Sequence, residues 1–152
     1  DYVEAHNNLG NAYKELGQLD DSVKCYKKAL TLKPDYTRAH NNLGIAFKQL
    51  GQVDAAVESY QKALAVNPDY VEAHNNLGNA YKELGQLDDA VKSYEKALAI
   101  NPDYAYAHNN LGNAFRELGQ LDDAVKSYEK ALAINPDFTG AQNNLSDAKA
   151  LK

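Results

Sequence analysis

Apolar and polar residues alternate in the three-to-four-residue rhythm of an amphipathic helix, twice within the first 34 residues. Residues 2–16 keep their apolar side chains on one side, and residues 19–32 do the same. Gly17 is predicted to end the first helix in the left-handed conformation, and Pro34 to end the second. Because only two or three residues separate the two helices, they are predicted to form an antiparallel hairpin.

This hairpin pattern returns along the whole chain. The segment HNNLGNAYKELGQ, which begins at His6, reappears unchanged from His74, with small changes from His40 and His108, and in a degraded form from Gln142. Each return comes about 34 residues after the last, a period that indicates a repeat array rather than one compact domain. The predicted fold is therefore all-α, with hairpins at 1–34, 35–68, 69–102 and 103–136 and a partly capping helix at 137–152.

The repeating residues resemble the signature of the tetratricopeptide repeat family, and the resemblance covers the whole chain. In the first unit the signature order is carried by Leu9, Gly10, Tyr13, Gly17, Tyr26, Ala29 and Pro34. Two positions depart from it: His6 and its equivalents stand where the family often has Trp, and Ser22 stands where Ala is usual. The resemblance implies an α-solenoid of antiparallel hairpins, a right-handed superhelix whose first helices line the concave surface.

The signature residues also have a physical reason to be there. Gly10 and Ala29 have little or no side chain, so the two helices of a hairpin are expected to approach closely at these positions. Tyr13 and Tyr26 are expected to fill the space between neighbouring pairs. A single hairpin cannot bury its apolar stripe, so each unit is expected to depend on its neighbours for stability.

Asparagines recur on the polar side of the first helix of every unit, and we call one set of them the groove row: Asn8, Asn42, Asn76, Asn110 and Asn144. An Asn amide both donates and accepts hydrogen bonds, so it can pair with a peptide backbone whatever the side chains. The first helices of neighbouring units are expected to lie about 10 Å apart. An extended peptide advances about 3.3 Å per residue, so one asparagine would meet its backbone roughly every third residue. We therefore predict a peptide-binding row. The other interpretation is that these side chains bond to helix ends of the adjacent unit or are simply solvated.

Further residues of the first helices are predicted to contact the same ligand. A second asparagine row, broken by Ile45 and Asp147, consists of Asn11, Asn79 and Asn113. A basic row consists of Lys14, Lys48, Lys82 and Arg116, and it runs beside the acidic residues Glu15, Glu83 and Glu117. The groove is therefore predicted to be mixed in charge.

Two family resemblances bear on the ligand. The repeat arm of the intracellular O-linked N-acetylglucosamine transferases is similar, with His-x-Asn-Leu segments and an asparagine ladder that holds the substrate backbone. Chaperone-binding members of the repeat family instead grip a C-terminal carboxylate with Lys and Arg as well as Asn. Here that carboxylate clamp is incomplete, because its first lysine is replaced by Asn7, Asn41 and Asn75.

No catalytic or metal chemistry is predicted. Successive histidines lie one unit apart, so at helix spacings of roughly 10 Å they cannot converge on a zinc ion, whose ligand bonds are about 2 Å long; a packing role is expected. Cys25 replaces a serine of the other units and has no neighbouring His to activate it. No phosphate-binding loop or nucleophile motif is present, so we expect no cofactor and no enzyme activity.

Composition narrows the partners. The formal net charge of -5 argues against nucleic acid and anionic membranes, which are met by clustered Lys and Arg. There is no long apolar run and no signal-peptide layout, so a cytoplasmic protein is expected. The chain opens in the middle of the repeat pattern at Asp1 and contains no methionine, so we expect a segment of a longer protein. Asp1 and Glu4 have the spacing of a capping box at the start of the first helix.

The sequence thus predicts a non-catalytic scaffold that binds an extended peptide or a partner segment in its concave groove. One alternative is the substrate-recruiting arm of a larger enzyme such as a glycosyltransferase. The other is a structural array: because the units are nearly identical and the ends incompletely capped, one molecule would stack end to end on the next.

Overall fold

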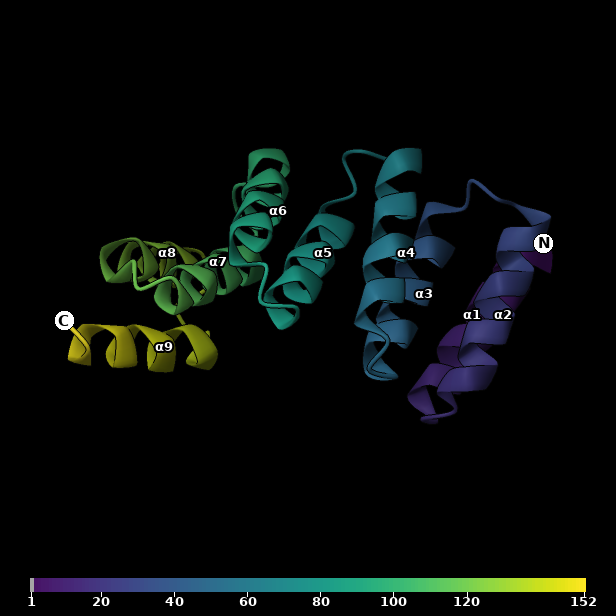
Figure 1. Ribbon diagram of the computed structural model, residues 1–152, viewed down its shortest axis with the longest axis horizontal. Helices are drawn as coiled ribbons and strands as arrows, with labels where there is room; N and C mark the ends of the chain where they lie inside the picture. Colours follow the sequence, from purple (N-terminus) through teal and green to yellow (C-terminus); the bar gives the residue numbers. More distant parts are fainter. Residues whose placement is uncertain (1) are drawn as a thin grey trace.

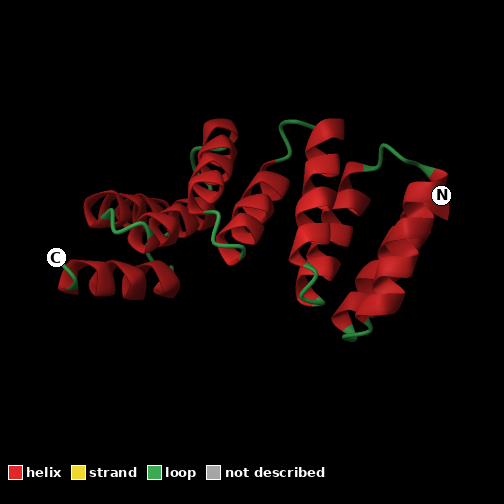
Figure 2. Cartoon of the chain, in the orientation of Figure 1, coloured by secondary structure: helices red, strands yellow, loops and turns green. Residues whose placement is uncertain are grey.

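The computed structural model describes residues 2–152, and this range forms nine α-helices and no strand. The helices are α1 (Tyr2–Glu15), α2 (Leu19–Leu32), α3 (Thr37–Gln49), α4 (Val53–Val66), α5 (Val71–Glu83), α6 (Leu87–Ile100), α7 (Ala105–Glu117), α8 (Leu121–Ile134) and α9 (Thr139–Ala150). Only short loops join them (Figure 2). The capping box expected at Asp1 lies outside the described residues.

The helices pack in consecutive pairs that follow one another along the molecule. Helices α1 and α2 form the first hairpin, and α2 then packs against α3 of the next hairpin, a scheme that repeats through α8 and α9. In Figure 1 the pairs run from the N-terminus at the right to α9 at the left, while the helices turn from steeply inclined to nearly horizontal. The predicted all-α solenoid of helix hairpins is confirmed.

The first helices of the hairpins form the inner surface of this stack. Helices α1, α3, α5, α7 and α9 each contact the next member of the set, whereas among the described residues no two even-numbered helices come as close. A stack whose layers are closer on one side curves toward that side. The odd-numbered helices therefore line the concave surface, as the family resemblance implies.

Each hairpin turns at a glycine in the left-handed region. Gly17 has φ 73°, and the amide of Gln18 donates to the carbonyl of Tyr13 at 2.9 Å. A side chain would be strained at such a φ, which is why glycine recurs there. The same geometry is found at Gly51, Gly85 and Gly119.

A buried tyrosine packs against a glycine inside every hairpin. In the third hairpin a Cβ atom at Gly78 would lie 2.5 Å from Cε1 of Tyr94, closer than any real contact. The Tyr94 ring is fully buried, together with Ala90, Leu111 and Ala114 of a cluster that spans α6 and α7. Each apolar core is thus completed by the following hairpin, which explains why one hairpin alone cannot bury its stripe.

Candidate functional site

Four members of the groove row, Asn42, Asn76, Asn110 and Asn144, each make a hydrogen bond to the preceding unit on the concave surface. Each of these four amides donates from Nδ2 to the side-chain oxygen of an asparagine one hairpin earlier, and we call those acceptors the buried row. Asn8, in the first hairpin, is exposed and makes no such bond among the described residues. The bonds are Asn42 to Asn7 at 3.1 Å, Asn76 to Asn41 at 3.1 Å, Asn110 to Asn75 at 3.1 Å and Asn144 to Asn109 at 2.9 Å. The partner is therefore another side-chain amide rather than a helix end.

These bonds leave part of each groove-row amide free. A carboxamide offers two N–H donors and an oxygen with two lone pairs. Asn76 and Asn110 use one donor each, and within residues 2–152 their oxygens make no hydrogen bond. Asn42 differs, because it donates to both Asn7 and Asn11, at 3.1 and 3.2 Å. The row thus presents oriented, half-buried amides with remaining bonding capacity.

The buried row sits too deep to meet a ligand. Asn7, Asn41 and Asn75 are buried, and Oδ1 of each accepts from the groove row. These are the positions where a carboxylate clamp would require lysine. Their amides are therefore engaged in joining adjacent hairpins.

The second asparagine row is tied to the buried tyrosines. The hydroxyl groups of Tyr26, Tyr94 and Tyr128 donate to Oδ1 of the asparagine on the preceding helix, at 2.7, 2.7 and 2.9 Å. Their acceptors are the predicted ligand contacts Asn11, Asn79 and Asn113. Each of these residues therefore links the two helices of its own hairpin.

The second hairpin lacks this link. Ile45 stands where the other hairpins have asparagine, and the Tyr60 hydroxyl has no hydrogen-bond partner among the described residues. Beside it lies a hollow of about 310 Å³ on the concave surface, lined by Ile45, Lys48, Gln49, Tyr60, Asn76 and Glu83. The sequence analysis identified Ile45 as a break in the second asparagine row but did not predict that Tyr60 would lose its hydrogen-bond acceptor. The sequence does contain the signal, because the second unit keeps the tyrosine and replaces the asparagine.

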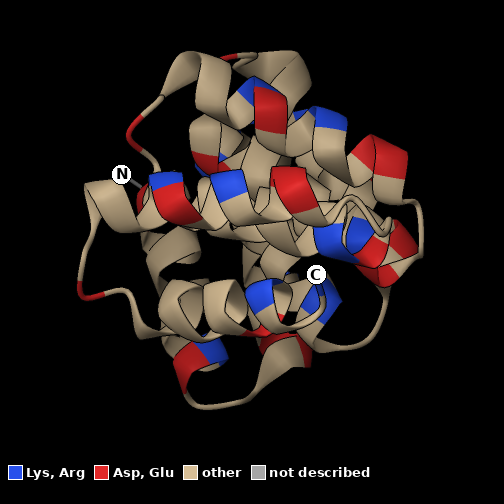
Figure 3. Ribbon diagram, turned by 90° about the vertical axis from the view of Figure 1, so that its left-hand side faces the viewer, with Lys and Arg blue, Asp and Glu red and all other residues tan. Residues whose placement is uncertain are grey.

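The basic and acidic rows pair across units. Lys48 Nζ lies 3.6 Å from Glu83 Oε2, and Lys82 Nζ lies 3.3 Å from Glu117 Oε1. All four side chains are partly exposed, so each pair contributes less than about 1 kcal/mol. Lys14 and Arg116 have no ion pair within residues 2–152. The end-on view in Figure 3 shows Lys and Arg interspersed with Asp and Glu over the helices.

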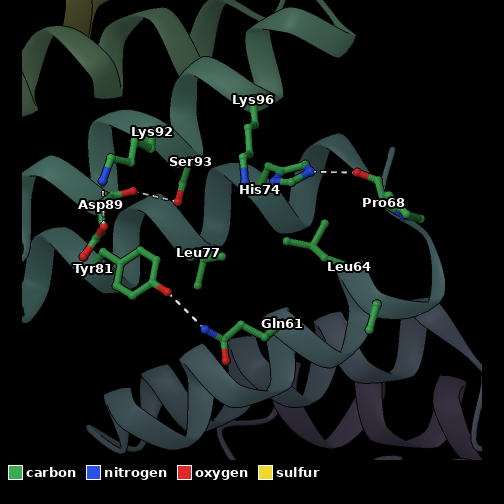
Figure 4. A pocket seen from close by; sticks show the side chains of 11 residues that line it. Gln61, Leu64, Pro68, His74, Leu77, Tyr81, Asp89, Lys92, Ser93 and Lys96 are labelled. Atoms are coloured by element: carbon green, nitrogen blue, oxygen red, sulfur yellow. Dashed lines mark hydrogen bonds and ion pairs between the residues drawn. The ribbon is translucent and has the colours of Figure 1, made fainter.

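The histidines brace the junctions between hairpins. Nε2 of His40, His74 and His108 lies 2.8, 2.7 and 2.8 Å from the carbonyl oxygen of the proline six residues earlier. Figure 4 shows His74 directed at Pro68, at the edge of an outer hollow of about 480 Å³ between α4 and α6. No group of three or more His, Cys, Asp and Glu side chains within residues 2–152 is arranged to hold a metal ion.

Two further features are the environment of Cys25 and the length of the helices. Cys25 is buried, and burial raises the pKa of its thiol, which disfavours the reactive thiolate. In the part of the chain that the structure covers, no helix combines the length and apolar character needed to cross a bilayer.

Comparisons with known proteins place these features in context. Family models match at four places: the TPR repeat over residues 10–51, 46–85 and 78–115, and the Tetratricopeptide repeat over residues 105–138. No curated protein sequence matches the chain.

Solved structures resemble the fold over nearly its whole length. MamA is 28% identical with a TM-score of 0.85, covering 93% of this chain and 82% of MamA. A thermophilic TPR protein of Thermus thermophilus is 26% identical with a TM-score of 0.85, covering 97% of this chain and 81% of its own. PilF of Pseudomonas aeruginosa, at 24% identity and a TM-score of 0.92, covers 99% of this chain and 68% of its own, and its likeness speaks to the fold alone.

Proposed function

The chain belongs to the tetratricopeptide repeat family, and from that premise we propose that it is a protein-interaction scaffold whose concave surface binds a partner segment in extended form. Within a larger enzyme the same groove would recruit the substrate protein. The observation that carries the proposal is the groove row, which repeats an oriented amide at every unit after the first.

The bonds between units favour binding as well as stability. An asparagine held by its neighbour has already lost rotamer freedom, so less entropy is lost when it pairs with a ligand. Asn76 and Asn110 each keep an oxygen and one N–H that a peptide backbone can use. If the asparagines bind the ligand backbone, the preference for particular ligand side chains would come from the surrounding groove residues. These include the ion pairs of Lys48 and Lys82.

The test uses a phage-displayed library of random peptides selected on the immobilised protein, followed by calorimetry on an enriched peptide. The variant Asn76→Ala/Asn110→Ala removes two groove amides. Two backbone bonds, each worth about 0.5–1.5 kcal/mol net, together contribute about 1–3 kcal/mol. Since about 1.4 kcal/mol corresponds to a factor of ten, binding is expected to be roughly 5- to 150-fold weaker.

A matched control separates binding from packing. Asn41→Ala/Asn75→Ala breaks the same two bonds between units from the buried side and leaves both groove amides in place. Both double variants are expected to lower the unfolding midpoint, but only the first is expected to weaken binding strongly. An equal loss of affinity in the two would assign the row to packing alone, and a library that yields no enriched peptide would overturn the scaffold proposal.

A second candidate function, end-to-end assembly, is favoured by one observation. The apolar stripe of α1 is exposed: Leu9 is 45% accessible, whereas the equivalent Leu77, covered by the preceding hairpin, is 7% accessible. Tyr2 and Leu16 continue the exposed stripe. A surface of this kind on an isolated molecule suits a second copy.

A further inference from the structure

The second hairpin differs from the other three at one internal contact. Tyr26, Tyr94 and Tyr128 each donate to an asparagine of their own hairpin. Tyr60 is equally buried, with only 1% of its surface accessible, yet Ile45 gives its hydroxyl no acceptor and no other described residue replaces it. The hydroxyl is not among the fully enclosed side-chain atoms that lack a partner, and Tyr60 lines the adjacent hollow. An acceptor group of a ligand in that hollow can therefore take the place of water at this hydroxyl.

The hollow beside Tyr60 presents a defined set of groups to that ligand. Ile45 supplies an apolar wall, and Asn76 keeps an oxygen and one N–H after its bond to Asn41. Lys48 and Glu83 face each other at 3.6 Å across the same hollow. A carboxylate entering here would be attracted by Lys48 and repelled by Glu83, and an ammonium the reverse, so the pair selects neither charge. A neutral polar group enters without breaking the pair.

We propose that this hollow is a side-chain subsite for a carboxamide, Gln or Asn, of the extended partner segment, and this rests on the proposed function. The carboxamide oxygen accepts from the Tyr60 hydroxyl, its amide donates to Asn76 or Glu83, and its methylene stem packs on Ile45. All three contacts are made by residues that line the hollow.

The ionisation of Tyr60 supports the donor role. Burial, and to a smaller extent the Glu83 charge, raises the pKa of the Tyr60 hydroxyl, so it stays protonated at neutral pH and offers its hydrogen. Because only the second hairpin combines Ile with the buried tyrosine, the subsite would also fix the register of a ligand that the uniform groove row leaves free to slide.

The test selects the same random-peptide library on four proteins: the wild type, Tyr60→Phe, Ile45→Asn and the control Tyr94→Phe. Tyr60→Phe keeps the ring and removes the donor, while Ile45→Asn supplies the internal acceptor that the other hairpins have. Tyr94→Phe removes a hydroxyl that Asn79 already accepts. Circular dichroism of each variant checks that the helices are intact.

Wild-type selections are expected to enrich Gln or Asn several-fold at one fixed position of the peptide. Tyr60→Phe and Ile45→Asn should still enrich peptides but lose that preference, and Tyr94→Phe should keep it. Calorimetry with the selected Gln replaced by Ala should then show a loss of affinity for the wild type and none for Tyr60→Phe.

The outcomes separate the two proposals. Peptides enriched without a carboxamide position, or a preference that survives in both Tyr60→Phe and Ile45→Asn, overturn the subsite while the scaffold function stands. A wild-type protein that enriches no peptide overturns both.

Discussion

At the residue scale, the repeats provide comparisons between identical side chains in different surroundings. Asn42 donates to both Asn7 and Asn11, whereas Asn76, Asn110 and Asn144 each donate to a single asparagine. Asn110 and Asn144 do so although Asn79 and Asn113 stand where Asn11 does. The replacement of Asn by Ile45 changes the bonding of the Tyr60 hydroxyl, while Asn76 keeps the same single bond as Asn110. Chemistry along the groove is set by such exceptions more than by the consensus.

The glycines provide a prediction at this scale. Gly78→Ala places a Cβ 2.5 Å from Tyr94 Cε1, inside a packed core, and is expected to cost about 1–3 kcal/mol through overpacking. Gly140→Ala meets only the edge of Phe138, at 3.1 Å, and gains helix propensity, so no loss is expected. Urea denaturation followed by circular dichroism compares the two midpoints. Similar midpoints for both variants would contradict the close-approach role of Gly78.

At the element scale, the helices and their pairing into hairpins could be predicted from the sequence, but the side-chain bonds between successive hairpins could not. The pattern predicts a helix over 19–32 and α2 spans Leu19–Leu32, while the helix predicted over 2–16 ends one residue earlier, at Glu15. Gly17 and Pro34 define these ends through local backbone geometry, which a sequence displays directly. The pairing of Asn76 with Asn41 depends on how one hairpin is rotated against the next, and no local pattern fixes that rotation.

The same Leu→Ala substitution is expected to lower the free energy of unfolding by different amounts in different helices of the array. Leu77→Ala removes a side chain enclosed between hairpins and is expected to cost about 2–5 kcal/mol. Leu9→Ala changes the same position on α1, where the side chain is 45% accessible, and is expected to cost less than about 1 kcal/mol. Guanidinium denaturation measures both. Equal shifts of the midpoint would mean that the α1 stripe is covered in solution.

At the scale of the whole array, residues 2–152 present two unlike end surfaces. The N-terminal end exposes the α1 stripe, and the C-terminal end exposes Leu151, which is 64% accessible, while Ala141 and Ala148 of α9 are buried. The concave surface between them carries a continuous row of amides. Binding in the groove and contact at the ends use different surfaces, so the two candidate functions can be tested separately.

The ends lead to the final prediction. Because the α1 stripe is apolar and uncovered, the mass measured by sedimentation equilibrium is expected to rise with protein concentration. Leu9→Glu/Leu16→Glu places charge on the stripe and is expected to restore a constant monomer mass. Leu32→Glu, at a leucine of α2 that is also exposed, is the control and should associate like the wild type. A wild-type mass that stays monomeric at every concentration would remove the assembly function.

The form of the association distinguishes its geometry. If two α1 stripes pack face to face, the symmetric contact is closed and growth stops at a dimer. If the α1 stripe packs on the end that carries Leu151, the contact is heterologous and the mass keeps rising, because each added molecule offers a new end. Leu151→Glu therefore should block the second mode and leave the first intact, and a variant that still grows beyond a dimer would exclude contact through α9.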